Sequence, residues 1–223
     1  MNKLLSIREL QKSKWPGLLQ QTFGDNLVSA FLHGECLMEG FDALRSPWTI
    51  SCILKESRAA EISAVRGLSK QAHNENIMFR HFFTPSEIVK TLDEFPLDYL
   101  HIANKSIALC GIQPFAGFIP QKDSLRRQCF RELTGTSFLL RQQLANAEKA
   151  KDIVRICSET AKSVLPLLYG AYFLKTGNYP ENHKQVYDMF PQLNGVPNGR
   201  NAESIEKASA RFAEALDEII NGI

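Results

Sequence analysis

The first half of the chain alternates between segments with a helical period and short apolar runs that are typical of strands. Leucine and isoleucine recur every three or four positions over residues 4–21, which indicates an amphipathic helix. Pro16 falls inside this segment, so we expect a break or a new first helical turn near Trp15. The same patterns predict strands over residues 27–32, 46–54, 77–83, 97–102 and 106–110, and helices over residues 56–73 and 85–92.

Two sequence signals mark where helices of this half begin. Thr84, Pro85 and Glu87 have the spacing of a capping box with proline at the first helical position. Ser57 is the expected N-cap of the helix over residues 56–73. Strands that alternate with helices in this way predict an α/β arrangement.

The second half of the chain shows only the helical period. Residues 111–120 contain two prolines and two glycines, and we place a domain boundary there. The predicted fold class is therefore α+β or α/β: a small mixed sheet with helices in residues 1–115, then an all-helical bundle in residues 120–223. Helices are expected over residues 122–150, 152–175, 182–190 and 201–220.

The amino-acid composition and the net charge limit the kinds of partner that this protein is expected to bind. The 223 residues are 44% hydrophobic and 22% charged, which is the balance of a folded protein rather than a disordered one. The formal net charge is +2 with both signs mixed along the chain, which argues against nucleic acid or an anionic membrane as the partner. No apolar stretch approaches the ~20 residues that span a bilayer.

The cysteines and the N-terminal residues predict the compartment. The five cysteines are widely spaced and form no C-x-x-C pair, so we expect free thiols rather than a disulfide framework or a zinc site. Charged residues interrupt the N-terminal apolar residues too early for a signal-peptide core. Together these features predict a cytoplasmic protein.

Residues 26–54 carry the most informative motif. The apolar run of residues 27–32 stops at Gly34, a looser segment with Gly40 follows, and Ser46 precedes the next strand. This order of strand, glycine, connector, serine and strand resembles the DNA-polymerase-β-like nucleotidyltransferases. The similarity extends to the minimal and kanamycin-type members, which pair a small α/β domain with a helical bundle. It implies the fold described above and transfer of a nucleotide from a magnesium–nucleoside triphosphate.

The sequence departs from the family pattern at the positions that carry the chemistry. In the family a serine follows the glycine and two aspartates on the second strand hold magnesium, whereas here Glu35, Pro47 and Thr49 stand at these positions. Phosphoryl transfer by two metal ions needs hard anionic oxygen ligands, which proline and threonine do not supply. The resemblance places the family's third carboxylate at Asp98, on the strand predicted over residues 97–102.

The candidate site residues each carry two interpretations. Glu35, Asp98 and His101 are candidate catalytic residues. The alternatives are a solvated carboxylate at a helix start for Glu35, a surface residue at the edge of the sheet for Asp98 and a hydrogen-bonded histidine of the sheet for His101. Arg126 and Arg127 either bind an anionic ligand between the domains or form a solvated basic face. We predict no metal site, because the histidines beside the strands lack ligand spacing. The candidate ligand-binding set is Gly34, Glu35, Ser46, Arg126 and Arg127.

Three functional hypotheses follow. The favoured one is a nucleotidyltransferase-like protein that has lost its chemistry and binds a small molecule or a protein partner in the cleft between the domains. The first alternative is an active transferase, with magnesium and nucleotide as cofactors, whose rearranged site uses Glu35, Asp98 and His101. The second alternative is an interaction subunit in which the helical bundle is a dimerisation surface, so that the protein is a homo-oligomer.

Overall fold

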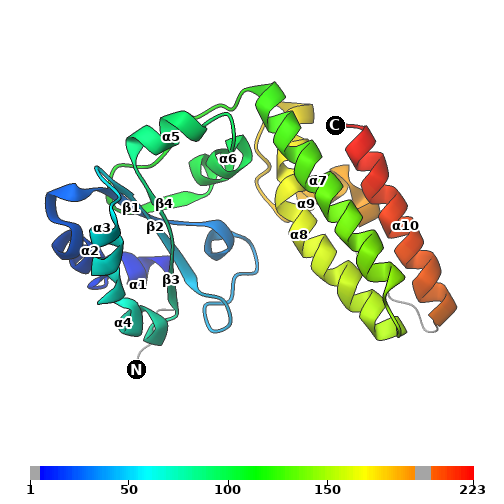
Figure 1. Cartoon of the computed structure of the whole chain (residues 1–223), viewed down its shortest axis with the longest axis horizontal. Coiled ribbons are helices and arrows are strands. Elements are labelled where there is room, and N and C mark those ends of the chain that lie inside the picture. Colours follow the sequence, from blue (N-terminus) through cyan, green and yellow to red (C-terminus); the bar gives the residue numbers. More distant parts are fainter. Residues whose placement is uncertain (1–5, 194–201) are drawn as a thin grey trace. The chain divides into compact units, whose positions relative to one another are not determined.

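The computed structural model describes residues 6–193 and 202–223. The chain forms two compact units, Met1–Pro120 and Gln121–Ile223, and the division falls at the end of the segment rich in glycine and proline. A four-stranded mixed sheet with helices is followed by a helical C-terminal region (Figure 1), so the predicted mixed α+β fold class is confirmed.

The sheet is built around its first strand. Strand β1 (Leu27–His33) pairs antiparallel with β2 (Trp48–Leu54) on one side and with β4 (Ser106–Gly111) on the other. Strand β3 (Ile77–Phe83) runs parallel to β2 at the edge, which gives the order β3-β2-β1-β4. Helices α3 (Ala59–Arg66) and α4 (Ser69–Asn74) supply the crossover that a parallel pair needs.

Local sequence signals explain where several helices begin. Helix α1 (Ile7–Lys12) ends before Trp15, where α2 (Trp15–Phe23) begins with proline in its first turn, so the predicted break is confirmed. Helix α5 (Pro85–Thr91) begins with the predicted capping box: the Glu87 N–H donates to Thr84 Oγ1 at 3.2 Å, and the Thr84 N–H donates to Glu87 Oε2 at 2.8 Å. Short 3-10 turns follow α2 and β1, over Gly24–Asn26 and Gly34–Leu37.

Two predicted elements of this unit are wrong. Residues 97–102 form no strand, because they belong to helix α6 (Pro96–Asn104). Proline at its first turn and Asp98 near its N-terminus are helix-start signals, and they outweigh the short apolar run, which suits either element. The helix predicted over residues 56–73 is two helices that are separated at Gly67, and its N-cap is Arg58 rather than Ser57.

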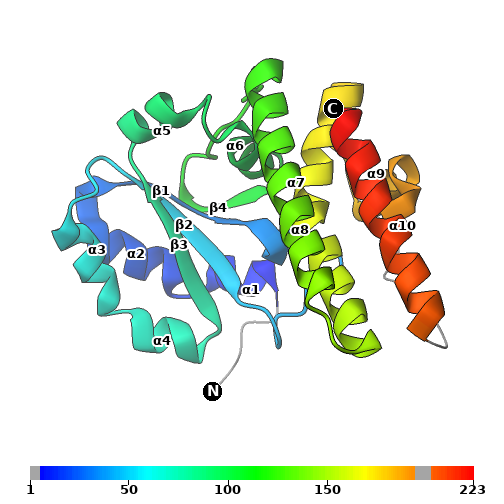
Figure 2. The ribbon, with the colours of Figure 1, turned by 45° about the vertical axis from the view of Figure 1, so that its right-hand side comes forward.

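The two faces of the sheet carry different cores. Even-numbered residues of β1 and β2 pack against α1–α4 in the larger core, which holds Trp15, Leu32 and Ile50 among its fully buried residues. Odd-numbered residues face the other side, where Phe31 and Ile53 pack with Ile102 of α6. In Figure 2 the helices α5 and α6 lie apart from α1–α4.

The C-terminal unit consists of long helices. Helices α7 (Lys122–Ala145), α8 (Ala150–Thr176) and α10 (Ala202–Asn221) pack against one another, and the short α9 (His183–Met189) contacts α8. A 3-10 turn follows α9 over Pro191–Leu193. Helix α8 ends at Gly177, whose φ of 75° is the left-handed C-cap conformation. Residues 4, 5 and 201, where helices were predicted to extend, lie outside the described residues.

Within residues 6–193 and 202–223, every helix is too short or too polar to cross a bilayer. The five cysteines are all free thiols, as expected.

The close contact between the backbones of β4 and β1 at Gly111 can be tested by mutation. Gly111 has a φ of 78°, and a Cβ atom added there would lie 2.2 Å from the Val28 carbonyl oxygen and 2.8 Å from Ser29 Cα. We expect Gly111→Ala to lower the free energy of unfolding by roughly 3 kcal/mol, through backbone strain plus a clash with an unyielding backbone. Both tryptophans are buried in this unit, so urea unfolding followed by their fluorescence reports it.

Gly40→Ala is the matched control for this variant. Gly40 also has a positive φ, of 81°, but nothing lies within 4 Å of an added Cβ atom. We expect it to cost about 1 kcal/mol, from the left-handed backbone alone. Equal losses for the two variants would contradict the close approach of β4 to β1.

Candidate functional site

The end of the sheet at which β1 stops gathers most of the polar side chains that are buried in the N-terminal unit. His33, Thr49 and Ser51 are 6%, 5% and 0% exposed, and all three are at odd-numbered positions on the face opposite α1–α4. Because side chains alternate along a strand, Thr49 and Ser51 share one face of β2. This face therefore changes from apolar at Ile53 to polar at Thr49.

An irregularity in the pairing of β2 with β3 joins the polar groups. The register shifts between Ile50 and Cys52, so that Ser51 stands opposite an extra residue of β3. The backbone N–H of His81 donates to Ser51 Oγ at 3.0 Å, and His33 Nε2 lies 2.7 Å from the same oxygen. Ser51 thereby links all three strands β1, β2 and β3 through a single hydroxyl.

The imidazoles at this site are held neutral. Burial lowers the pKa of His33 to about 4, and the neighbouring His81 and Arg80 add to the decrease. Burial, followed by Arg80, also lowers the pKa of His81, while the Asp98 carboxylate acts in the opposite direction. At neutral pH the polar end of the sheet consequently presents uncharged imidazole and hydroxyl groups.

Aromatic rings continue from the two histidines along the same face. The ring of His33 lies 5.5 Å from Phe31 and 5.7 Å from His81, and His81 stacks on Phe83 at 5.1 Å. Tyr99 of α6 extends the row, with its ring centroid 6.1 Å from that of Phe83. The rings therefore form one continuous row of contacts across β1, β3 and α6.

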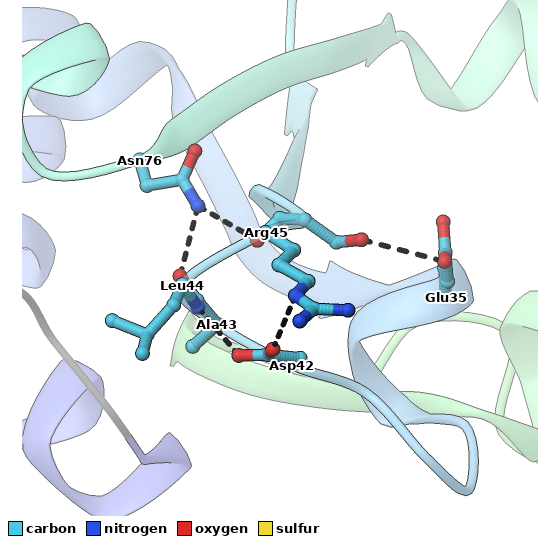
Figure 3. A network of polar contacts seen from close by, with 7 residues as sticks. Glu35, Asp42, Ala43, Leu44, Arg45 and Asn76 are labelled. Carbon is cyan, nitrogen blue, oxygen red and sulfur yellow. Dashed lines mark hydrogen bonds and ion pairs between the residues drawn. The ribbon is translucent and has the colours of Figure 1, made fainter.

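The connector between β1 and β2 is fixed by Asn76, as Figure 3 shows. Its side-chain amide donates to the carbonyl oxygens of Ala43 at 2.9 Å and of Ser46 at 2.8 Å. The backbone carbonyl oxygen of Asn76 accepts the Trp48 N–H at 2.8 Å, and the φ angle of Asn76 is 55°. One residue at the start of β3 thus holds the loop that precedes β2.

The predicted residues Gly34, Glu35 and Ser46 lie together in this connector. Ser46 Oγ donates to Glu35 Oε1 at 3.5 Å, a long hydrogen bond, and the Glu35 side chain is exposed (Figure 3). Gly34 has a φ of 78° and nothing within 4 Å of an added Cβ atom, so the backbone turns there in open space.

The other predicted residues lie on helices. Asp98 is exposed in the first turn of α6 and acts electrostatically on His81, whereas His101 is in the last turn of that helix. In the C-terminal unit, Arg126 pairs with Asp123 at 2.9 Å and donates to the carbonyl oxygen of Ile223. Arg127 donates to Ser124 Oγ at 2.9 Å.

The donor set beside Gly34 does not fit magnesium. Thr49 and Ser51 offer neutral hydroxyls, and His33 offers an imidazole nitrogen, whereas magnesium prefers several hard anionic oxygens in an octahedron. Among the described residues, no group of three or more His, Cys, Asp and Glu side chains is placed to hold a metal ion. What these groups can do is hydrogen-bond.

The sequence does not predict the pair of His33 and Ser51. The alternation of β1 and β2 places both side chains on one face, but their contact also needs the pairing register of the two strands. The hydroxyl is fully buried and also accepts the His81 N–H, so it ties strands together rather than meeting a substrate.

The burial of His33 predicts a pH dependence of stability. Because its pKa is about 4 in the folded state and about 6.5 in the unfolded state, the unfolded state binds more protons between these values. Stability is therefore lost as pH falls through this window. We expect urea unfolding, followed by tryptophan fluorescence, to show about 2 kcal/mol more loss between pH 7 and pH 4.5 in the wild type than in His33→Gln.

His33→Gln keeps a hydrogen-bonding group near Ser51 but does not titrate, and the carboxylates that also respond to acid are common to both proteins. Their contributions cancel in the comparison. Parallel pH profiles for the two proteins would mean that His33 is not buried in a neutral form.

The connector yields a separate prediction at Asn76. We expect Asn76→Gly, which accepts the positive φ but loses both side-chain hydrogen bonds, to cost about 2 kcal/mol. Asn76→Ala loses the same bonds and adds roughly 1 kcal/mol of backbone strain. Tryptophan fluorescence in urea measures both, and wild-type stability in the glycine variant would refute the role of the amide.

Comparison with known proteins adds no relative to this description. The chain matches no protein-family model and no curated protein sequence. Its functional interpretation therefore rests on the residues described above and on their resemblance to the nucleotidyltransferase pattern.

Proposed function

We propose that this protein is a nucleotidyltransferase-like protein that has lost metal-dependent nucleotide transfer. In this proposal it acts in the cytoplasm by binding a small molecule or a protein partner at the end of the sheet beside Gly34. The observation that carries the proposal is the chemistry of that end. The positions nearest the turn hold Thr49, Ser51 and His33, which are neutral and buried.

The electrostatics support loss of the reaction rather than its relocation. A triphosphate needs cations to offset its charge as it approaches the backbone N–H groups at a strand-to-helix turn. Glu35 instead adds a carboxylate directly after Gly34, and it is exposed in the connector beside Ser46. A neutral or cationic ligand group suits this environment better than a triphosphate does.

The alternative of an active transferase needs Glu35, Asp98 and His101 to act together. The contacts described for Glu35 and Asp98 lead to different neighbours, since Glu35 bonds Ser46 and Asp98 acts on His81. Asp98 is also on a helix, not on the strand where the family's third carboxylate is expected. These observations favour the first function over the alternative.

Thermal unfolding with nucleotides distinguishes the two functions. We expect millimolar ATP, GTP, CTP or UTP with magnesium to leave the melting temperature within about one degree of that with magnesium alone, because residues 47 and 49 of the second strand offer the metal no anionic ligand. An active transferase would be stabilised by a magnesium–nucleotide, and Glu35→Ala or Asp98→Ala would remove the effect. Magnesium-dependent transfer of a labelled nucleotide to any acceptor would overturn the proposal.

A gain-of-metal variant tests the assignment of positions. If residues 47 and 49 correspond to the family's aspartate pair, Pro47→Asp combined with Thr49→Asp should create binding of Mn²⁺ near the sheet, measured by titration calorimetry. Pro47→Asn with Thr49→Asn is the control, since it matches the size without the charge. If the aspartate variant folds, as judged by circular dichroism, and binds no more Mn²⁺ than the control, the assignment of these positions is wrong.

A further inference from the structure

The sheet ends at strand β4. Among the described residues β4 pairs with β1 alone, so one of its two edges meets no other strand. The N–H and C=O groups of successive residues point to alternate edges of a strand, and those of Ser106 and Ala108 lie on the edge that faces away from β1. We call these backbone groups the outer edge of β4. An edge of this kind is a template on which another chain can add a strand.

The side chain of Gln113 covers the outer edge of β4. Its amide nitrogen donates to the carbonyl oxygen of Ser106 at 2.9 Å and to Ser106 Oγ at 2.7 Å, and its amide oxygen accepts the Ala108 N–H at 3.3 Å. A strand added in parallel would use the same two backbone groups, since its residue opposite Ile107 would bond to both neighbours of Ile107. The amide of Gln113 therefore takes the place of a peptide backbone.

A buried hydroxyl fixes the turn that brings Gln113 back to β4. Gly111 ends the strand with a φ of 78°, a left-handed conformation that lets the chain change direction. Ser29 of β1 is 0% exposed, and its hydroxyl donates to the carbonyl oxygen of Ile112 at 2.6 Å. The residue before Gln113 is thus tied to β1, and this contact holds the exposed Gln113 beside the strand.

We propose that Gln113 is an edge cap, which prevents another chain from adding a strand to β4. Its hydrogen bonds satisfy the groups through which an added strand would bind, and they are made within one copy of the chain. An approaching strand has to break these bonds before it can make its own, so it gains no net hydrogen bond at this point. Without the cap, two copies of β4 can pair edge to edge across a two-fold axis.

A second glutamine provides a matched control. Gln11 of α1 lies at the same strand, and its Nε2 is 3.5 Å from the carbonyl oxygen of Ala108, which is long for a hydrogen bond. Gln11 and Gln113 are both exposed, so replacing either one by alanine removes no part of the core. Gln11→Ala therefore matches Gln113→Ala in residue type, exposure and location, but leaves the Ala108 N–H with its acceptor.

Hydrogen exchange of the Ala108 amide, followed by NMR in the full chain, tests the contact itself. We expect Gln113→Ala to raise the exchange rate of this amide about tenfold, because the N–H loses its acceptor. Gln11→Ala should leave the rate within about twofold of that in the wild type. An unchanged rate in Gln113→Ala would overturn the cap, because a different group would then protect the amide.

Sedimentation velocity over a concentration series tests the consequence of the cap. We expect Gln113→Ala to lower the dissociation constant of self-association at least tenfold relative to the wild type and to Gln11→Ala. Equal self-association of Gln113→Ala and the wild type would overturn the proposal. Equal gains in the two alanine variants would also overturn it, because Gln113 would then have no role of its own at the edge.

Gln113→Lys separates strand pairing from partial unfolding. Lysine cannot accept the Ala108 N–H, so this amide should exchange about as fast as in Gln113→Ala. Its ammonium group beside the edge opposes the approach of a second backbone, however, and the variant should sediment like the wild type. If Gln113→Lys associates as strongly as Gln113→Ala, the association does not use the outer edge of β4 and the proposal is overturned.

Discussion

Pairing of β1 with strands on both sides determines which face of the sheet the side chains of β1 and its neighbours occupy. The ladder places Phe31 opposite Ser51 of β2 and Leu32 opposite Ile50. A slip of one residue would exchange the two faces, so that leucine and isoleucine would leave the larger core and the polar residues would enter it. The burial of Leu32 and Ile50 against α1–α4 therefore fixes the position of His33 and Ser51 on the opposite face.

The neutrality of that opposite face follows from its burial. A carboxylate at Ser51, which is fully buried, would need a metal or several donors to offset the cost of leaving water. A hydroxyl makes no such demand, and here its oxygen is within hydrogen-bonding distance of His33 Nε2 and the His81 N–H. Imidazole meets the same condition, because it is polar yet uncharged when its pKa is lowered by burial. The buried polar groups of this face are therefore neutral and hydrogen-bonded, and they need no cation to offset a charge.

The sequence predicts a structural feature when the residues that determine it are neighbours along the chain. The capping box at Thr84 and the break at Trp15 were predicted because each depends on residues within one turn of it. The strand prediction over residues 97–102 is wrong because a short apolar run fits both elements, and the helix-start signals of Pro96 and Asp98 outweigh it.

In the candidate site, too, the sequence predicts local features but not contacts between distant residues. Gly34, Glu35 and Ser46 lie in one connector, because the sequence places all three between two neighbouring strands. The contact of His33 with Ser51 joins residues 18 apart and needs the strand register. The irregularity that brings the His81 N–H to Ser51 leaves no mark in the residue types, so it could not be predicted.

Under the proposed function, Glu35, Pro47 and Thr49 share one explanation. A glutamate after Gly34 would repel a triphosphate, and a neutral second strand would fail to hold the magnesium that offsets such repulsion. Under the proposed function either feature alone would weaken nucleotide transfer, and without a bound magnesium–nucleotide the Glu35 carboxylate repels no ligand phosphate. Its carboxylate is then free to interact with Ser46 and solvent, as it does in the connector. Two side-chain hydrogen bonds from Asn76 hold the loop, so its conformation does not depend on a metal.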